Sequence, residues 1–167
     1  SFVDERILSP STQGTWVPAD AISDAMRRAN DGCPLHFIFH TGHVGSTLVS
    51  RLLDVFGDVL SLREPMPLRT LPDAMDVLAL PESLLSAAQF DHRLALFTKL
   101  WGRGYDATRL VVLKATSSAG RLAVPLLERS TRSRAIYMNM RAGPYLAVVL
   151  AGEDSRWDLR GHGPGRG

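Results

Sequence analysis

The feature that most limits the fold of this chain is a glycine-containing loop between an apolar segment and a helical pattern. Residues 35–39 form a short apolar run rich in Phe and Ile, which predicts a buried strand. After the loop 41–47, apolar residues recur at helical spacing from Leu48 to Phe56. The sequence therefore predicts the order strand, glycine loop, helix.

Further short apolar runs alternate with helical patterns along the rest of the chain. Runs at 59–62, 110–113 and 135–140 predict three more strands. Helical spacing is present over 82–101 and 122–127 and up to Leu150, and Asp20 is expected to cap a short helix that ends at Arg28. The proline-punctuated stretch 65–72 receives no regular element. This alternation predicts an α/β fold of three layers, α/β/α, around a mostly parallel sheet.

Composition excludes several classes of protein. The chain has 167 residues, 45% of them hydrophobic and 22% charged, which is enough for one globular core. No apolar run reaches the roughly 18 residues of a membrane span. A net charge of +2 does not favour nucleic acid, although basic residues predominate after residue 100. One cysteine, Cys33, and a beginning unlike a signal peptide lead us to expect a cytoplasmic protein.

The loop has the residues of an anion-binding site. A strand that runs through a glycine loop into a helix offers free backbone N–H groups and the positive end of the helix dipole. Gly42 and Gly45 allow close approach of a ligand, and Ser46 and Thr47 add hydroxyl donors. A loop that only caps its helix would have the same pattern. Gly45 is followed directly by Ser46, without the lysine of nucleoside-triphosphate P-loops, which counts against a kinase or an ATPase.

This segment resembles the 5′-phosphosulfate loop of the sulfotransferases. The similar residues are Gly42, His43, Val44, Gly45, Ser46, Thr47 and Leu48, followed by Ser50, Arg51, Leu52 and Leu53. His43 stands where the family usually has Arg or Lys, and Val44 where it usually has Ser. The likeness extends over residues 35–152 and is strongest to the tyrosylprotein and bacterial enzymes.

Three more residues follow the family's order. Glu64, after the second strand, corresponds to its catalytic base, and Lys114, at the end of the third, to the lysine that neutralises the transferring group. Arg141, after the fourth strand, corresponds to the arginine that contacts the 3′-phosphate. The family's second 3′-phosphate contact, a serine, falls at Val149. With Glu64, the resemblance makes His43 and Lys114 the catalytic residues.

The resemblance implies a fold like that of the P-loop nucleoside triphosphate hydrolases and an enzyme that uses 3′-phosphoadenylyl sulfate (PAPS) without a metal. Its acceptor would be a hydroxyl of a small molecule, carbohydrate or peptide. We expect one sulfotransferase-like nucleotide-binding domain over residues 1–152, truncated relative to the family, and a flexible Gly- and Arg-rich tail over 153–167.

Two other functions remain open from the sequence. One is a P-loop-like small-molecule kinase, which should need magnesium and a loop lysine. The other is a non-catalytic or truncated nucleotide-binding module, which His43 and Val149 would suit. A metal site is not expected, because His36 and His40 have strand-like separation and no carboxylate close to them in sequence.

Overall fold

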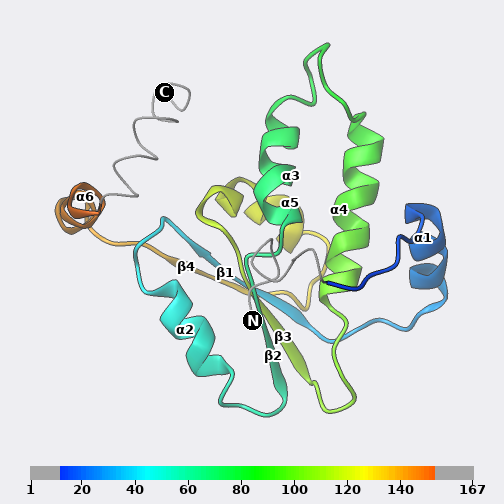
Figure 1. The fold of residues 1–167 in the computed structure, drawn as a ribbon, viewed down its shortest axis with the longest axis horizontal. Helices are drawn as coiled ribbons and strands as arrows, with labels where there is room; N and C mark the ends of the chain where they lie inside the picture. The colour runs from blue at the N-terminus through cyan, green and yellow to red at the C-terminus, as the bar shows by residue number, and fades with distance from the viewer. Residues whose placement is uncertain (1–11, 153–167) are drawn as a thin grey trace.

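The computed structural model describes residues 12–152, so the expected tail 153–167 lies outside the described residues. Four strands form one parallel sheet in the order β2-β3-β1-β4 (Figure 1). The strands are β1 (Leu35–His40), β2 (Val59–Arg63), β3 (Leu110–Lys114) and β4 (Ala135–Met138). The helices are α1 (Ala19–Arg28), α2 (Ser46–Leu53), α3 (Pro67–Asp76), α4 (Ala87–Trp101), the 3₁₀-helix η2 (Ser117–Leu122), α5 (Ala123–Leu127) and α6 (Ala142–Ala151). An α/β fold with a parallel sheet is thus confirmed.

One face of the sheet carries the main hydrophobic core. Successive residues of a strand point to opposite faces, so Leu35, Phe37 and Phe39 of β1 share one side. These residues pack with Val111 and Leu113 of β3 in the main core. Helices α3, α4, η2 and α5 cover this side, and their fully buried residues are Leu68, Leu94, Ala119, Leu122 and Leu126. The core therefore fixes the two central strands, whose carboxyl ends lie beside each other.

Helix α2 lies against the opposite face and is attached to it by buried polar contacts. The hydroxyls of Ser50 and Ser61 are 2.7 Å apart, and the Ser61 hydroxyl also donates to the Ser50 carbonyl at 2.9 Å. Arg63, which is buried, forms an ion pair with Asp54 after the helix. These contacts hold α2 against β2. The sheet therefore lies between α2 on one face and the helices of the main core on the other, which makes three layers.

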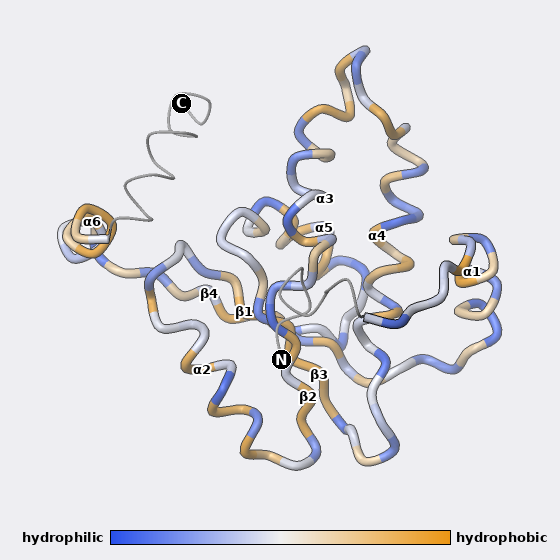
Figure 2. Tube along the Cα trace, in the orientation of Figure 1, coloured by the Kyte–Doolittle hydropathy of each residue, from blue (hydrophilic) through white to orange (hydrophobic). Residues whose placement is uncertain are grey.

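The β4 edge of the sheet is apolar and uncovered. Ile136 and Tyr137 are 50% and 59% exposed, although they are consecutive residues that point to opposite faces. Helix α6 is apolar around most of its circumference and extends away from the sheet (Figure 2). Leu48 and Leu52 of α2 are also exposed. Parallel strands are usually buried on both faces, so β4 differs from the other three strands of the sheet.

Helix α3 was not predicted, and its prolines explain why. Pro67 occupies the first turn, where its missing N–H costs nothing. Pro72 lies inside the helix, where it cannot donate to the carbonyl of Leu68. The hydroxyl of Thr116 donates to that carbonyl instead, at 3.1 Å. A side chain from the segment after β3 thus supplies the hydrogen bond that α3 lacks at Leu68, 48 residues earlier in the chain.

Three predicted element boundaries were wrong. Asp20 does not cap α1, because the helix begins at Ala19 and Pro18 is its N-cap, so Asp20 lies in the first turn. Helix α4 begins at Ala87 and not near residue 82, because Ser86 and Gln89 form a reciprocal capping box. Strand β4 ends at Met138, two residues before the end of the predicted apolar run.

Candidate functional site

The loop after β1 adopts an unusual backbone conformation. Gly42, His43 and Gly45 have φ angles of 92°, 53° and 78°, all in the left-handed region. Glycine adopts these angles freely, whereas His43 pays a steric cost. Left-handed residues in a tight turn direct successive N–H groups toward the same side of the backbone, which forms a concave cradle for an anion.

The loop leads directly into the amino end of α2. Gly45 is the N-cap and has no side chain to accept hydrogen bonds from the first turn. This turn contains no acidic residue, and its first side chains are the hydroxyls of Ser46, which is buried, and Thr47, which is half-buried. Half-buried Val44 precedes the N-cap. The six loop residues predicted to bind the ligand are therefore contiguous at one helix N-terminus.

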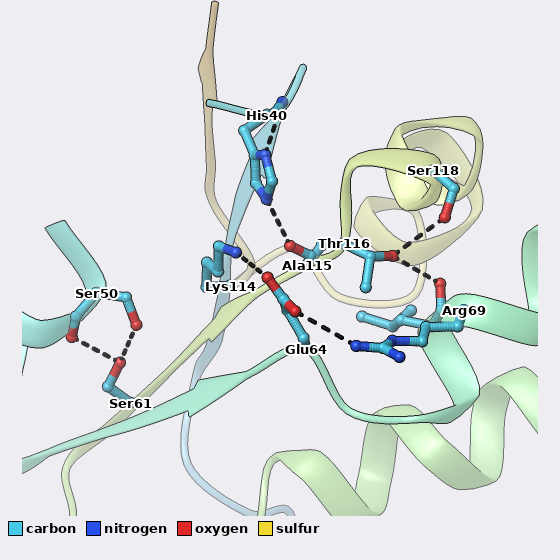
Figure 3. Close-up of polar contacts among 11 residues, drawn as sticks. His40, Ser50, Ser61, Glu64, Arg69, Lys114, Ala115, Thr116 and Ser118 are labelled. Atoms are coloured by element: carbon cyan, nitrogen blue, oxygen red, sulfur yellow. Dashed lines mark hydrogen bonds and ion pairs between the residues drawn. The ribbon is translucent and has the colours of Figure 1, made fainter. Parts of the chain in front are cut away.

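His40, the last residue of β1, links this loop to the neighbouring strand. Its ring Nδ1 accepts a hydrogen bond from the backbone N–H of Gly42 at 2.9 Å. Its Nε2 lies 2.8 Å from the carbonyl oxygen of Ala115, which directly follows β3. Figure 3 shows both contacts, and the side chain is buried. The sequence had singled out His40 only as an unsuitable metal ligand, so this role was missed.

Glu64 and Lys114 meet at the carboxyl edge of the sheet. They follow and end the adjacent strands β2 and β3, and the N–H of Glu64 donates to the Lys114 carbonyl at 2.8 Å. Their side chains form an ion pair, and an Arg69 nitrogen lies 3.7 Å from the second carboxylate oxygen of Glu64 (Figure 3). Glu64 has a left-handed φ of 48°, an uncommon angle for a non-glycine residue that recurs at functional sites. Two of the three predicted catalytic residues, Glu64 and Lys114, are thus in direct contact.

The side-chain charges also connect His40 to this pair. Burial, followed by the Lys114 ammonium, lowers the pKa of His40 below its usual range. The hydrogen bond to Ala115 and the Glu64 carboxylate act in the opposite direction, and His43 adds a small lowering of the pKa. Residues from the loop, from β3 and from the end of β2 therefore act on one imidazole, which places them in a single cluster.

Arg141 lies at the same edge of the sheet, on the other side of the loop. It is the exposed N-cap of α6, three residues after β4, which pairs with β1. One turn later, the Tyr145 hydroxyl lies 3.3 Å from the carbonyl oxygen of Thr41, to which it can donate. The N–H of Thr41 donates to Met138 of β4 at 3.2 Å. The start of α6 is therefore attached to the start of the loop, while Arg141 itself is exposed.

A cavity of about 270 Å³ lies at the opposite, amino-terminal edge of the sheet. Its lining includes the ends of α1 and α4 and the side chains of Lys99, Arg103 and Arg129. Helix C-termini carry partial negative charge, so basic residues there stabilise the helix ends without any ligand. Ligands of open parallel sheets bind at the carboxyl ends of the strands, and we therefore locate the functional site at the loop.

Two further properties of residues 12–152 bear on the kind of protein this is. No helix in this part of the chain has the length and hydrophobicity needed to cross a bilayer. The same residues contain no group of three or more His, Cys, Asp or Glu side chains arranged to hold a metal ion.

Comparisons with protein-family models, curated proteins and solved structures gave no significant match to this chain. The class that the fold defines is an α/β protein with a four-stranded parallel sheet, and its site is a glycine loop at the end of a central strand. A function therefore has to be argued from the geometry of this site.

Proposed function

We propose that the chain is a sulfotransferase that binds PAPS at the loop 41–47 and transfers the sulfuryl group to an acceptor hydroxyl. The observation that carries this proposal is the left-handed loop from Gly42 to Gly45, which opens directly into an uncapped helix N-terminus. Backbone N–H groups of residues 43–47 can surround the 5′-phosphosulfate, and the hydroxyls of Ser46 and Thr47 can donate to the same oxygens.

The residues around the loop supply the charges that sulfuryl transfer requires. The acceptor oxygen forms a bond to sulfur while the bond from sulfur to the bridging phosphate oxygen breaks, and the electron pair of that bond stays on the phosphate. Lys114, His43 and the loop amides stabilise the charge that develops on the transferring group and the leaving oxygen. Glu64 accepts the proton that the acceptor hydroxyl loses. All bonds and charges balance without a metal ion.

The placement of the cation favours sulfuryl transfer over transfer of a terminal phosphoryl group. In nucleoside-triphosphate P-loops the lysine belongs to the loop itself, whereas Gly45 is followed here by Ser46. The buried lysine at this edge, Lys114, comes instead from β3 and is held by Glu64. A single ammonium suits a sulfuryl group, which carries less charge than a terminal phosphate.

Arg141 is proposed to bind the 3′-phosphate of the nucleotide. It is exposed at the start of α6, whose first turn contacts the loop through Tyr145. A guanidinium binds a phosphate through two parallel hydrogen bonds, which no neutral side chain can replace.

We place the enzyme in the cytoplasm, in keeping with the free thiol of Cys33.

The first test is the thermal stability of the protein with 3′,5′-bisphosphoadenosine, with AMP and with ATP plus magnesium. A ligand at ~100 times its Kd raises the free energy of unfolding by about 2.7 kcal/mol, which shifts the Tm by several degrees. We expect the bisphosphate to stabilise the protein more than the other two ligands do. Equal or smaller stabilisation by the bisphosphate would contradict the proposal, and a preference for magnesium ATP would favour a kinase.

A matched pair of variants locates the 3′-phosphate contact. Arg141→Ala should weaken binding of the bisphosphate by tenfold or more, about 1.4 kcal/mol, and leave AMP binding within about threefold. Arg132→Ala removes an exposed arginine before the opposite end of β4 and should change neither affinity. Equal losses for bisphosphate and AMP in Arg141→Ala would remove this residue from the proposed role.

A further inference from the structure

We infer that His40 is a positioning residue whose neutral imidazole holds the loop in its anion-binding conformation, and that protonation of the ring at acidic pH releases the loop and weakens nucleotide binding. The inference rests on the proposed function, because it concerns the same loop. It adds a residue that does not contact the substrate, and it predicts that nucleotide binding at the site depends on pH.

The hydrogen bonds of His40 define its protonation state. A backbone N–H can only donate, so the Nδ1 atom that faces Gly42 must be an unprotonated acceptor. A backbone carbonyl can only accept, so the Nε2 atom that faces Ala115 must carry the proton. Both bonds are satisfied only by the neutral ring with its proton on Nε2. In the imidazolium, Nδ1–H and the Gly42 N–H would be two donors facing each other.

The His40 side chain forms a bridge between Gly42 of the loop and Ala115 after β3. This bridge excludes one backbone N–H group from the anion-binding site. The N–H of Gly42 is used by His40, so it does not belong to the anion cradle, and the cradle begins at His43. Gly42 itself has a left-handed φ of 92°, so the chain turns directly after this hydrogen bond. Ala115 is itself fixed, because its N–H donates to the Ile38 carbonyl at 3.0 Å. The loop is therefore anchored to the sheet at a point that the core already holds rigid.

The surroundings of His40 favour the neutral ring. The charged and titratable groups that act on it are Lys114 of β3, Glu64 after β2 and His43 of the loop. Burial and the nearby ammonium both disfavour an imidazolium, so the pKa of His40 is lowered from its usual value. The loop is thus held at neutral pH and released only under more acidic conditions.

The first test needs no ligand. In long-range ¹H–¹⁵N NMR spectra of the wild-type protein at pH 7.5, we expect His40 to show a protonated Nε2 and an unprotonated Nδ1. Titration to the acidic pH at which the ring protonates should change the ring signals and the amide signal of Gly42 together. A proton on Nδ1 at pH 7.5, or a Gly42 amide that does not respond to ring protonation, would overturn the inference.

Two variants separate the two hydrogen bonds. The amide oxygen of Asn reaches approximately the position of Nδ1, so His40→Asn keeps an acceptor for Gly42 and loses the bond to Ala115. The amide nitrogen of Gln reaches approximately the position of Nε2, so His40→Gln does the reverse. Neither side chain titrates. A third variant, His36→Asn, is the matched control, because His36 accepts an N–H at the other end of β1, that of Arg134 at 3.0 Å.

The probe is 3′,5′-bisphosphoadenosine, with Kd measured at pH 7.5 and at the acidic pH at which the NMR titration shows the His40 ring protonated. We expect His40→Asn to bind within about threefold of wild type at pH 7.5 and His40→Gln to bind about tenfold more weakly. Between these two pH values the wild type and His36→Asn should lose more affinity than His40→Asn, whose remaining loss measures the titration of groups other than residue 40. Identical pH profiles for wild type and His40→Asn would overturn the inference. If wild type binds no bisphosphate, the proposed function fails, and the NMR titration still tests the bridge.

Discussion

The ion pair between Glu64 and Lys114 makes a prediction about stability as well as catalysis. The Lys114 side chain is 3% exposed and that of Glu64 is 18% exposed. Glu64→Gln removes the counter-charge of a buried ammonium, a change that typically costs 3–5 kcal/mol. Because Glu64 is partly exposed and Gln retains an acceptor oxygen, we expect a loss of about 3 kcal/mol, which lowers the Tm by roughly 6–12 °C.

The reverse substitution should cost less. Lys114→Met leaves a carboxylate that still has Arg69 at 3.7 Å and contact with water, so we expect a loss of about 1 kcal/mol. The double variant should lose less than Glu64→Gln alone, with a coupling energy of about 2 kcal/mol. Asp73→Asn is the control, because its ion pair with Arg121 is exposed and should contribute under about 0.5 kcal/mol.

Urea unfolding at pH 7.5 measures all four free energies of unfolding. If Glu64→Gln loses less than about 1 kcal/mol, or if Lys114→Met loses more than Glu64→Gln does, then the buried ammonium does not need the Glu64 carboxylate as its partner, and the reasoning is refuted. The Glu64→Gln variant also tests catalysis. If Glu64 accepts the acceptor proton, Glu64→Gln should abolish turnover while the affinity for the bisphosphate stays within a few-fold; normal turnover would exclude Glu64 as the base.

Three further predictions concern the segments that hold the site. Thr116→Val should lower the free energy of unfolding by about 1–2 kcal/mol, because the Leu68 carbonyl loses its donor, whereas Thr116→Ser should not, and urea unfolding distinguishes them. Gly45→Ala should cost about 1–2 kcal/mol in the same assay from its φ of 78° alone, since no atom lies within 4 Å of the added Cβ; a neutral effect would mean that the loop adopts another conformation. Burial, as the largest cause, lowers the pKa of both His36 and His40 from 6.5, so below that pH the unfolded chain binds more protons than the folded one. Their contribution to stability is therefore present above pH 6.5 and is lost as the pH falls, and unfolding at pH 7.5 and 5.5 should show a smaller decrease when both are replaced by Asn.

The sequence predicted elements wherever one local signal dominated. Strand β1 and the loop after it combine an apolar run with two glycines, and both are found where expected. Helix α3 was missed because Pro72 is a strong local signal against a helix, and its compensation by Thr116 depends on a contact 48 residues away in the chain. Local patterns cannot report a partner of this kind.

The same limit applies to the site. The sequence placed Glu64 and Lys114 at strand ends but could not bring them into contact, because strand order in a parallel sheet does not follow chain order. The bridge made by His40 was missed for a related reason, since Ala115 is 75 residues away. The available signal was a polar residue that ends a buried strand two positions before Gly42, where an apolar residue would ordinarily be expected.

The strand order explains why these residues meet where they do. The chain leaves β1 through α2 to reach β2 beyond β3, and it leaves β3 through η2 and α5 to reach β4 beyond β1. The two connections pass over opposite faces, so the segments after β1 and β3 diverge at the carboxyl ends of these strands, which is where open α/β sheets bind their ligands. His40 spans this division from β1 to Ala115, and Lys114 adds a positive charge beside it. The imidazole joins the start of the loop to the segment after β3, so the protonation of His40 should affect binding at the loop more than that of His36 at the other end of the same strand.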